Sequence, residues 1–320
     1  MPDGSLLTID VWDNAKQGEY PHAKAFPTRI VKLSPDSKVL WSVPLPAHHE
    51  LRLLPGGQIL TLTERNRRIQ KIDRRHLVVD NGIAWLSPHG KLLREISLYD
   101  IVRRSRLITL HPVKPNSFHL VDLFHSNAIS RVADIPLTFQ PTGKWTELYA
   151  PDNLVLSSRH QNFVAIISPK KRKLIWAWGQ GTLSGPHSGR MLPSGDILVF
   201  DNGLGRGFSR VVEVDPRTNR IVWQYQADHP ADFYSGSGGA VQRLANGDTL
   251  VTDAWKYTVF EVTPEGRVVW RFVSPGRSFL YRLHRYDERY FTPAVRSSFE
   301  PPERPSPERT ATPSAVSSGR

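Results

Sequence analysis

Two histidines of this chain stand at the same place relative to a turn. His49 lies six residues before the turn at Pro55, and His187 lies six residues before the turn at Pro193. Each turn opens an apolar run of strand-like residues. Imidazole can act as a proton donor, a proton acceptor, a nucleophile or a metal ligand near neutral pH. The recurrence indicates a repeated structural unit whose equivalent corners carry groups capable of this chemistry.

The elements that must position these groups repeat along the chain. Four turns each precede an apolar run, and a fifth fits less well: Pro2-Asp3-Gly4, Pro55-Gly56-Gly57, Pro193-Ser194-Gly195 and Ala245-Asn246-Gly247, with Pro151-Asp152-Asn153 as the weaker member. Most are followed by two further runs, the last of which ends in tryptophan at Trp41, Trp176, Trp223 and Trp270. Because the tryptophan holds a constant position in the repeat, we expect it to pack between units.

Short runs separated by Gly, Pro, Asn and Asp turns are typical of β-strands. A period of about 50 residues implies units that bury their faces only against one another. The sequence therefore predicts an all-β fold, a β-propeller of six blades. Five repeats are clear, and the sixth is expected to be partial or built from both chain ends, because residues 100–150 are irregular.

Composition divides the chain into a globular body and a polar end. Residues 1–290 are predicted to form the propeller, and residues 291–320, rich in Ser, Pro and Arg, a disordered tail. The chain has no cysteine, which excludes disulfides and thiolate metal sites. No apolar run is long enough to span a membrane, and no signal-peptide pattern opens the chain. Its compartment is left unassigned.

The net charge of +12 favours anionic partners. The basic clusters fall in predicted loops of different units, and no aromatic stacking surface accompanies them, so nucleic acid is not expected as a partner. We interpret these clusters as solvated turns: Arg67-Arg68, Arg74-Arg75, Arg103-Arg104 and Lys170-Lys171-Arg172-Lys173.

Several polar motifs, taken in order, resemble those of bacterial aryl-sulfate sulfotransferases. The resemblance spans residues 45–290 and rests on six segments: Ala47-His48-His49-Glu50, Asp122-Leu123-Phe124-His125-Ser126-Asn127, Ser158-Arg159-His160-Gln161-Asn162, Pro186-His187-Ser188, Ser209-Arg210-Val211-Val212-Glu213-Val214-Asp215-Pro216 and the closing Tyr281-Arg282-Leu283-His284. The family commonly has Gln-His-Asp where this chain has Pro186-His187-Ser188, and His-His-Asp where it has His48-His49-Glu50.

The resemblance implies a six-bladed propeller with its active site in the central channel. It implies that His187 is the nucleophile in sulfuryl transfer between phenols, and that His49, His125, Asn127 and Arg159 surround the sulfuryl and phenolic oxygens. Aryl sulfates and phenols are then the small-molecule partners. No metal and no organic cofactor is required, and the oligomeric state is left open.

The chemistry of sulfuryl transfer suits these residue types. Negative charge develops on the sulfuryl oxygens and on the departing phenolate, so fixed donors must face both. Arg159 offers a permanent guanidinium fork, Asn127 an amide, and His49 or His125 a proton for the phenolate. His160 follows Arg159 on a predicted strand, where neighbouring side chains face opposite ways, and is expected to point away from the site.

Two other functions remain open. A metal-dependent propeller enzyme, a hydrolase or a quinoprotein, would use His49, His125 and His187 as ligands of a divalent ion. A catalytically silent propeller would only bind anions. The triplets Asp80-Asn81-Gly82 and Asp201-Asn202-Gly203 could supply calcium ligands, but Asn-Gly is a frequent tight-turn signal, and we interpret both as turns.

Overall fold

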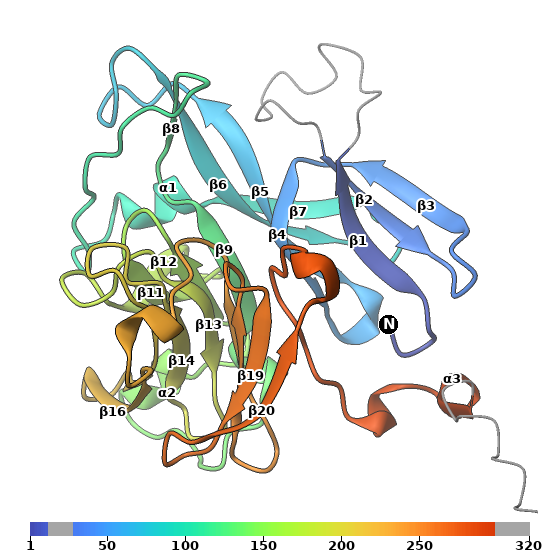
Figure 1. The fold of residues 1–320 in the computed structure, drawn as a ribbon. Helices are drawn as coiled ribbons and strands as arrows, with labels where there is room; N and C mark the ends of the chain where they lie inside the picture. Colours follow the sequence, from blue (N-terminus) through green and yellow to red (C-terminus); the bar gives the residue numbers. More distant parts are fainter. Residues whose placement is uncertain (12–27, 298–320) are drawn as a thin grey trace, which may run out of the picture.

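The protein is a β-propeller of five sheets arranged in chain order (Figure 1). A computed structural model describes residues 1–11 and 28–297. The first sheet has three strands and the others four in sequence, each antiparallel to its neighbour, and β8 (Leu120–Asp122) adds to the second sheet in parallel with β6. The first sheet consists of β1 (Leu6–Val11), β2 (Thr28–Leu33) and β3 (Val39–Pro44), and the second of β4 (Ala47–Leu53), β5 (Ile59–Arg67), β6 (Leu77–Leu86) and β7 (Leu92–Ser97). The third consists of β9 (Ser126–Arg131), β10 (Leu154–Ser158), β11 (Phe163–Ser168) and β12 (Lys173–Trp178), and the fourth of β13 (His187–Met191), β14 (Ile197–Asp201), β15 (Arg210–Asp215) and β16 (Arg220–Tyr225). The fifth consists of β17 (Ala240–Arg243), β18 (Thr249–Asp253), β19 (Thr258–Val262) and β20 (Val268–Val273).

All five turns that marked the repeat open a strand, namely β1, β5, β10, β14 and β18. The glycines of four of them have φ between 77° and 90°, as a tight turn of this kind requires: Gly4, Gly57, Gly195 and Gly247. The triplet Asp80-Asn81-Gly82 does not form a turn, and that prediction is wrong, because it lies inside β6. The chain turns at Gly203 (φ 73°), as predicted for the second triplet.

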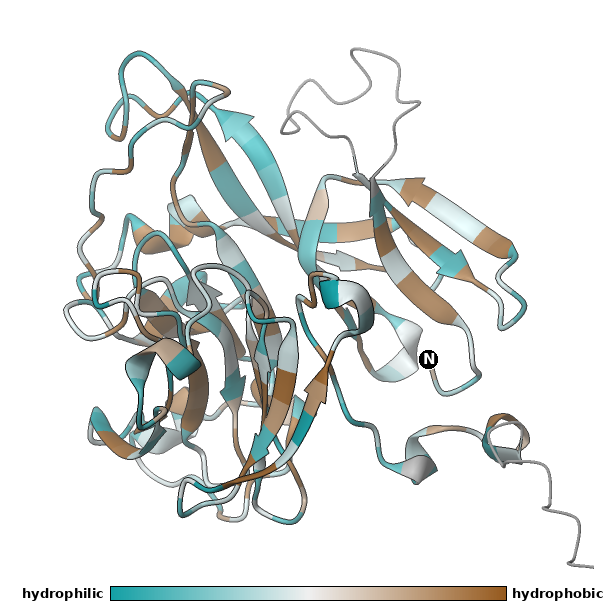
Figure 2. Ribbon diagram, viewed as in Figure 1, coloured by the Kyte–Doolittle hydropathy of each residue, from teal (hydrophilic) through white to brown (hydrophobic). Residues whose placement is uncertain are grey.

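The core lies between adjacent sheets. Every residue of β10, β11 and β14 is buried, whereas the outer strand β20 is exposed along its whole length. Apolar residues, brown in Figure 2, follow the strands, and polar residues gather in the loops and in the outer half of β5. Burial of each large apolar side chain contributes about 1.5–3 kcal/mol, so sheet-to-sheet contact supplies most of the stability.

Five blades are present in the described residues, and the predicted sixth is not. Within residues 1–11 and 28–297, no strand of the first sheet pairs with a strand of the last. Instead the C-terminal segment, red in Figure 1, runs from the last sheet to the first. Arg285 forms an ion pair with Glu261 of β19 (2.7 Å), and the Thr292 N–H donates to the Pro2 carbonyl (2.9 Å).

The repeated tryptophans confirm this arrangement with one exception. Trp41 packs on Gly90 of the second sheet, the Trp176 indole N–H donates to Asn219 of the fourth (2.7 Å), and that of Trp223 to the Pro264 carbonyl of the fifth (2.7 Å). Each therefore contacts the next blade. Trp270 is 40% exposed, so the packing prediction is wrong there, because no described blade follows its own.

Three short α-helices complete the described part: α1 (Leu98–Val102), α2 (Trp145–Leu148) and α3 (Pro293–Ser297). The last of these lies beyond the predicted domain boundary at residue 290, and residues 298–320 of the predicted tail lie outside the described residues. None of the described helices is long and apolar enough to cross a membrane.

Candidate active site

Irregularities at the starts of three innermost strands aim side chains at a common place. The pairing of β4 with β5 shifts between His48 and Leu51, and that of β13 with β14 shifts between His187 and Arg190. The inserted residues adopt positive φ: His49 at 61° and Ser188 at 56°. His125, directly before β9, has φ 46°. Such a backbone is uncommon for residues other than glycine and clusters at functional sites, and bulges re-aim side chains next to active sites.

His187 is buried and held by a side chain of its own blade. Its Nδ1 lies 2.7 Å from Asn202 Oδ1 and 3.0 Å from the Gly185 carbonyl. Asn202 cannot turn its amide around, because its Nδ2 donates to the carbonyls of Ser235 (2.7 Å) and Gly238 (2.8 Å). Two acceptors therefore face Nδ1, which must carry the proton. The lone pair of His187 is then on Nε2.

The residues flanking His187 do not orient it. Ser188, at the position where the family resemblance leads us to expect Asp, accepts the Val241 N–H on its hydroxyl (3.2 Å). The side chain that holds the His187 ring is Asn202. A signal for this existed, because Asn202 follows the strand that pairs with the start of β13, but the triplet containing it was interpreted only as a turn.

Burial lowers the pKa of His187 to about 3; its bonds to Asn202 and Gly185 oppose this shift, and the charges of Arg159 and His125 add to it. We expect the folded ring to stay neutral from pH 8 to pH 5, whereas a free imidazole of pKa about 6.5 becomes almost fully protonated over that range. NMR titration of ring-labelled protein, with the His187 signals assigned by His187→Gln, measures this directly. A midpoint near 6.5 would contradict it.

The same shift affects stability in one direction. The unfolded chain takes up this proton below pH 6.5 and the folded chain only near pH 3, so the contribution of His187 to stability is complete above pH 6.5 and is lost as the pH falls from 6.5 towards 3.

A second group of side chains surrounds Arg159. Its guanidinium lies 3.0 Å from His160 Nε2 and donates to the Gly236 carbonyl (3.4 Å), and its buried Nε has no partner in the described part of the chain. Desolvation lowers the pKa of Arg159, although a guanidinium remains charged in proteins. This partly unsatisfied cation, placed among histidines, is suited to an oxoanion.

His125 and His160 stand side by side, with ring centroids 4.8 Å apart. Asp122 accepts a hydrogen bond from His125 Nδ1 at 2.6 Å, which fixes the ring. His160 Nδ1 donates to the Asp122 carbonyl (2.6 Å), so His160 faces the cluster. The prediction that it points away is wrong, because β10 ends at Ser158 and the alternation of a strand no longer applies at residue 160.

His49 and Tyr281 connect the two groups. The His49 ring is 5.1 Å from His125 and 5.7 Å from Tyr281, and Tyr281 is 6.5 Å from His187. Burial raises the pKa of the Tyr281 hydroxyl to about 12, which keeps it a proton donor. Tyr281 was part of the motif set, but no role was predicted for it, since only the folded chain brings residue 281 beside residues 49 and 187.

Glu50 holds the C-terminal segment in place. Its buried carboxylate accepts hydrogen bonds from Arg190 (2.9 Å) and Arg282 (2.8 and 2.9 Å), and Arg52 lies 3.4 Å away. Arg282 adjoins Tyr281 in the chain, so this ion-pair network fixes the tyrosine against the histidines. At this position the family resemblance leads us to expect Asp, and the Glu found here reaches β4, β13 and the C-terminal segment.

Asn127 is fully buried on β9, and its Nδ2 donates to the Pro186 carbonyl (2.9 Å). One of its amide protons is therefore engaged with the peptide before His187. Its Oδ1 is buried with no hydrogen-bond partner among the residues the structure describes. Asn127 thus connects the blade of His125 to that of His187 and retains an unsatisfied acceptor.

The side chains with metal-ligand spacing are not the set His49, His125 and His187 that the metal-dependent alternative would use. In the described part of the chain, the group with metal-ligand spacing is Asp122, His125 and His160, whose ligand atoms lie within 4.8 Å of one another. His160 has Arg159 on Nε2 and the Asp122 carbonyl on Nδ1, so both of its nitrogens are occupied. A divalent cation there would stand beside the Arg159 charge, and the donor set does not suit one.

The acidic residues of the Asp-Asn-Gly triplets are neutralised by arginines. Asp201 pairs with Arg206 (2.8 Å) and Arg210 (2.9 Å), and Asp80 pairs with Arg67 (2.6 Å). These ion pairs occupy the carboxylates that a calcium ion would need.

Comparison with known proteins points to one family. Residues 24–275 match the family described as Arylsulfotransferase (ASST). The arylsulfate sulfotransferase AssT of Lelliottia amnigena is 27% identical over an alignment of 159 residues, and the match covers 35% of this chain and 27% of that protein. The matched region therefore covers about a quarter of the curated relative.

Solved structures align with the chain at low sequence identity. A protein of unknown function from Bacteroides caccae aligns at 17% identity and a TM-score of 0.47, over 79% of this chain and 78% of that one. Virginiamycin B lyase from Staphylococcus aureus aligns at 12% identity and a TM-score of 0.43, over 85% and 75%. The family match covers most of the described blades. It also covers His49, His125, Arg159, His160 and His187, which together with Tyr281 we call the histidine cluster, but it ends before Tyr281. Because the match extends over most of the chain, the chain belongs to the arylsulfotransferase family.

Proposed function

We propose that this protein transfers a sulfuryl group from an aryl sulfate to a phenolic acceptor, with His187 as the covalent carrier. The observation that carries the proposal is the fixed tautomer of His187, whose Asn202 contact leaves the Nε2 lone pair on a buried, neutral ring. A neutral imidazole is nucleophilic without prior loss of a proton. The charges of Arg159 and His125 act on this ring, and Tyr281 lies beside it.

In the first half-reaction, the Nε2 lone pair of His187 attacks sulfur and the bond from sulfur to the aryl oxygen breaks. The bond electrons leave with the phenolate, and sulfohistidine forms. Arg159 faces the charge on the sulfuryl oxygens, where a fixed donor is most effective. The phenolate takes a proton from a neighbouring donor, for which His49, His125 and the Tyr281 hydroxyl are the candidates.

In the second half-reaction, an acceptor phenol gives its proton back to the same group while its oxygen attacks sulfur. The bond from sulfur to Nε2 breaks, and its electrons restore the neutral imidazole. The proton count is unchanged over the cycle. Asn127, through its bond to the Pro186 carbonyl, positions the peptide that carries His187.

Rapid mixing with a chromogenic aryl sulfate in the absence of acceptor tests the proposal. We expect a burst of phenol equal to the enzyme concentration, an increase in protein mass by one SO₃ on the peptide containing His187, and ping-pong kinetics once acceptor is added. Sequential kinetics, with no burst and no modified peptide, would mean direct transfer between bound phenols.

A further inference from the structure

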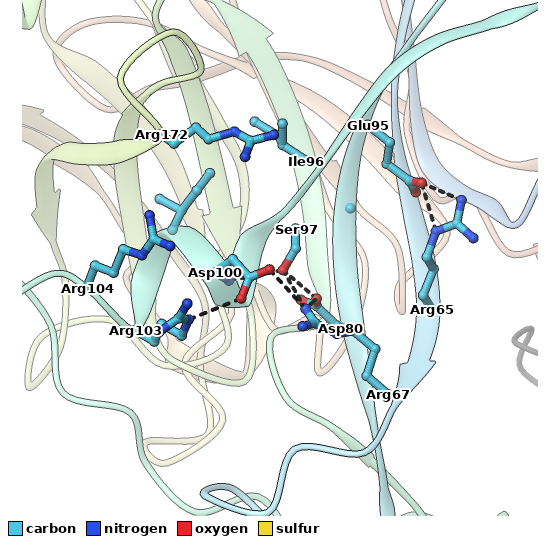
Figure 3. Close-up of a pocket in the computed structure, with 12 residues that line it drawn as sticks. Arg65, Arg67, Asp80, Glu95, Ile96, Ser97, Asp100, Arg103, Arg104 and Arg172 are labelled. Atoms are coloured by element: carbon cyan, nitrogen blue, oxygen red, sulfur yellow. Dashed lines mark hydrogen bonds and ion pairs between the residues drawn. The ribbon is translucent and has the colours of Figure 1, made fainter.

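Three basic clusters that lie far apart in the sequence meet at one pocket between the second and third blades (Figure 3). Arg67 comes from β5, Arg103 and Arg104 follow α1, and Arg172 lies in the turn between β11 and β12. The pocket has a volume of about 380 Å³, which is in the range of small-molecule sites. Arg103, Arg104 and Arg172 are exposed in turns, as the interpretation of solvated turns predicts, whereas Arg67 is half-buried at the end of β5.

The pocket carries more positive than negative charge. Five arginines and three carboxylates line it, and each carboxylate is already paired. Glu95 accepts from Arg65 Nε (2.7 Å), Asp80 from Arg67 (2.6 Å), and Asp100 from Arg103 (3.1 Å). Subtracting three pairs from five arginines leaves two cations. The excess belongs to Arg104 and Arg172, for which no carboxylate partner is found in the described part of the chain.

The two excess guanidiniums share the side of the pocket next to an apolar surface. In Figure 3, Arg104 and Arg172 lie opposite the Arg65–Glu95 pair, with Ile96 beside the head of Arg172. Ile96 and Ile101 line the pocket and are 3% and 2% exposed. The geometry combines two exposed guanidiniums with a pocket floor at which these isoleucines show little surface.

The backbone at Arg172 supports a functional role for this side chain. Arg172 has φ 50° at the fourth residue of a four-residue turn between β11 and β12. The equivalent turn between β15 and β16 has Asn219 at that position, with φ 59°. Asparagine tolerates this conformation better than most residues. The third blade thus has an arginine at the turn position where the fourth blade has an asparagine, which suits this backbone conformation better.

We propose that this pocket binds an organic phosphate or sulfate monoester. The oxoanion lies between the Arg104 and Arg172 guanidiniums, whose planar forks match its oxygens. The organic part occupies the rest of the pocket, since its volume of about 380 Å³ is far larger than a bare tetrahedral ion. The site shares no residue with the histidine cluster and does not depend on the proposed transfer reaction.

Calorimetric titration with phenyl phosphate, inorganic phosphate and phenol at constant ionic strength tests the site. We expect phenyl phosphate to bind tighter than inorganic phosphate by about 10-fold, because the ring adds apolar burial, and phenol not to bind there. In the Arg104→Ala/Arg172→Ala protein, the affinity for phenyl phosphate should fall by about 10–100-fold, as for loss of charge-assisted hydrogen bonds.

Two control variants separate this site from other cations. Arg106→Ala removes an exposed charge from the same loop outside the pocket and should leave the affinity unchanged. Arg159→Lys alters the histidine cluster and should also leave this binding event intact. If Arg106→Ala lowered the affinity for phenyl phosphate equally, net charge alone would account for the binding. If only Arg159→Lys lowered the affinity, the ligand would bind at the histidine cluster. Either outcome overturns the proposal. Phenyl sulfate in place of phenyl phosphate, tested on the His187→Ala protein to prevent turnover, distinguishes the two esters.

Discussion

The His187→Ala protein is expected to lose aryl-sulfate cleavage by about 10⁴-fold or more, the order seen when a covalent nucleophile is removed. Without Nε2 no sulfohistidine forms, so the phenol burst and the transfer to acceptor disappear together. Stopped-flow absorbance and steady-state transfer measure the two losses. Turnover at the unaltered rate would show that another group attacks sulfur.

Two further variants make this test specific. In His187→Gly, added imidazole should restore phenol release, because a free ring can occupy the vacated buried space. Asn202→Leu removes the acceptor that fixes the Nδ1 proton, and we expect a loss of about 10²–10³-fold with a burst of reduced rate, since a misplaced tautomer weakens but does not remove the nucleophile. An unaffected Asn202→Leu enzyme would contradict the orienting role of Asn202.

The Glu50→Ala protein is expected to be destabilised by about 3–5 kcal/mol, because removing one partner of a buried ion pair leaves uncompensated charge. Arg190 and Arg282, with side chains only 11% and 13% exposed, would face each other without their carboxylate. For a domain of this size, the melting temperature should fall by about 6–15 °C. Thermal unfolding followed by circular dichroism measures the change.

The control for this experiment is Glu265→Gln, which neutralises an exposed carboxylate and should leave the melting temperature unchanged. Glu50→Gln keeps one carbonyl acceptor and should give an intermediate loss. Activity provides a second readout: release of Arg282 also releases Tyr281 from His49, so kcat should fall at temperatures where the Glu50→Gln protein is still folded. Equal stability of the Glu50→Ala and wild-type proteins would mean that the network contributes nothing net.

Local signals were sufficient for the elements of the fold. Each Pro-X-Gly turn followed by an apolar run became a turn and a strand, because glycine at positive φ and period-two burial are decided by neighbouring residues. The number of blades could not be predicted from local sequence. Whether a sixth sheet forms depends on what packs against β20 and β1, and there the chain places its C-terminal segment instead of a sheet.

Motif order in the sequence nominated His49, His125 and His187 as site residues, and their roles remain predictions. What orients them was decided by tertiary contacts. Asn202 reaches His187 across a strand pair, and His160 faces the cluster because its strand has already ended, whereas the contact of Asp122 with His125, three residues on, is local.

Tyr281 and the arginine pocket needed the folded chain even more. Residue 281 meets residue 49 through an ion pair that spans 232 positions, and Arg67, Arg104 and Arg172 meet from two blades. Residue type and local spacing therefore determined which chemistry this protein carries. The tertiary structure alone decided which side chains share a site, because that depends on distances through space between residues remote in the chain.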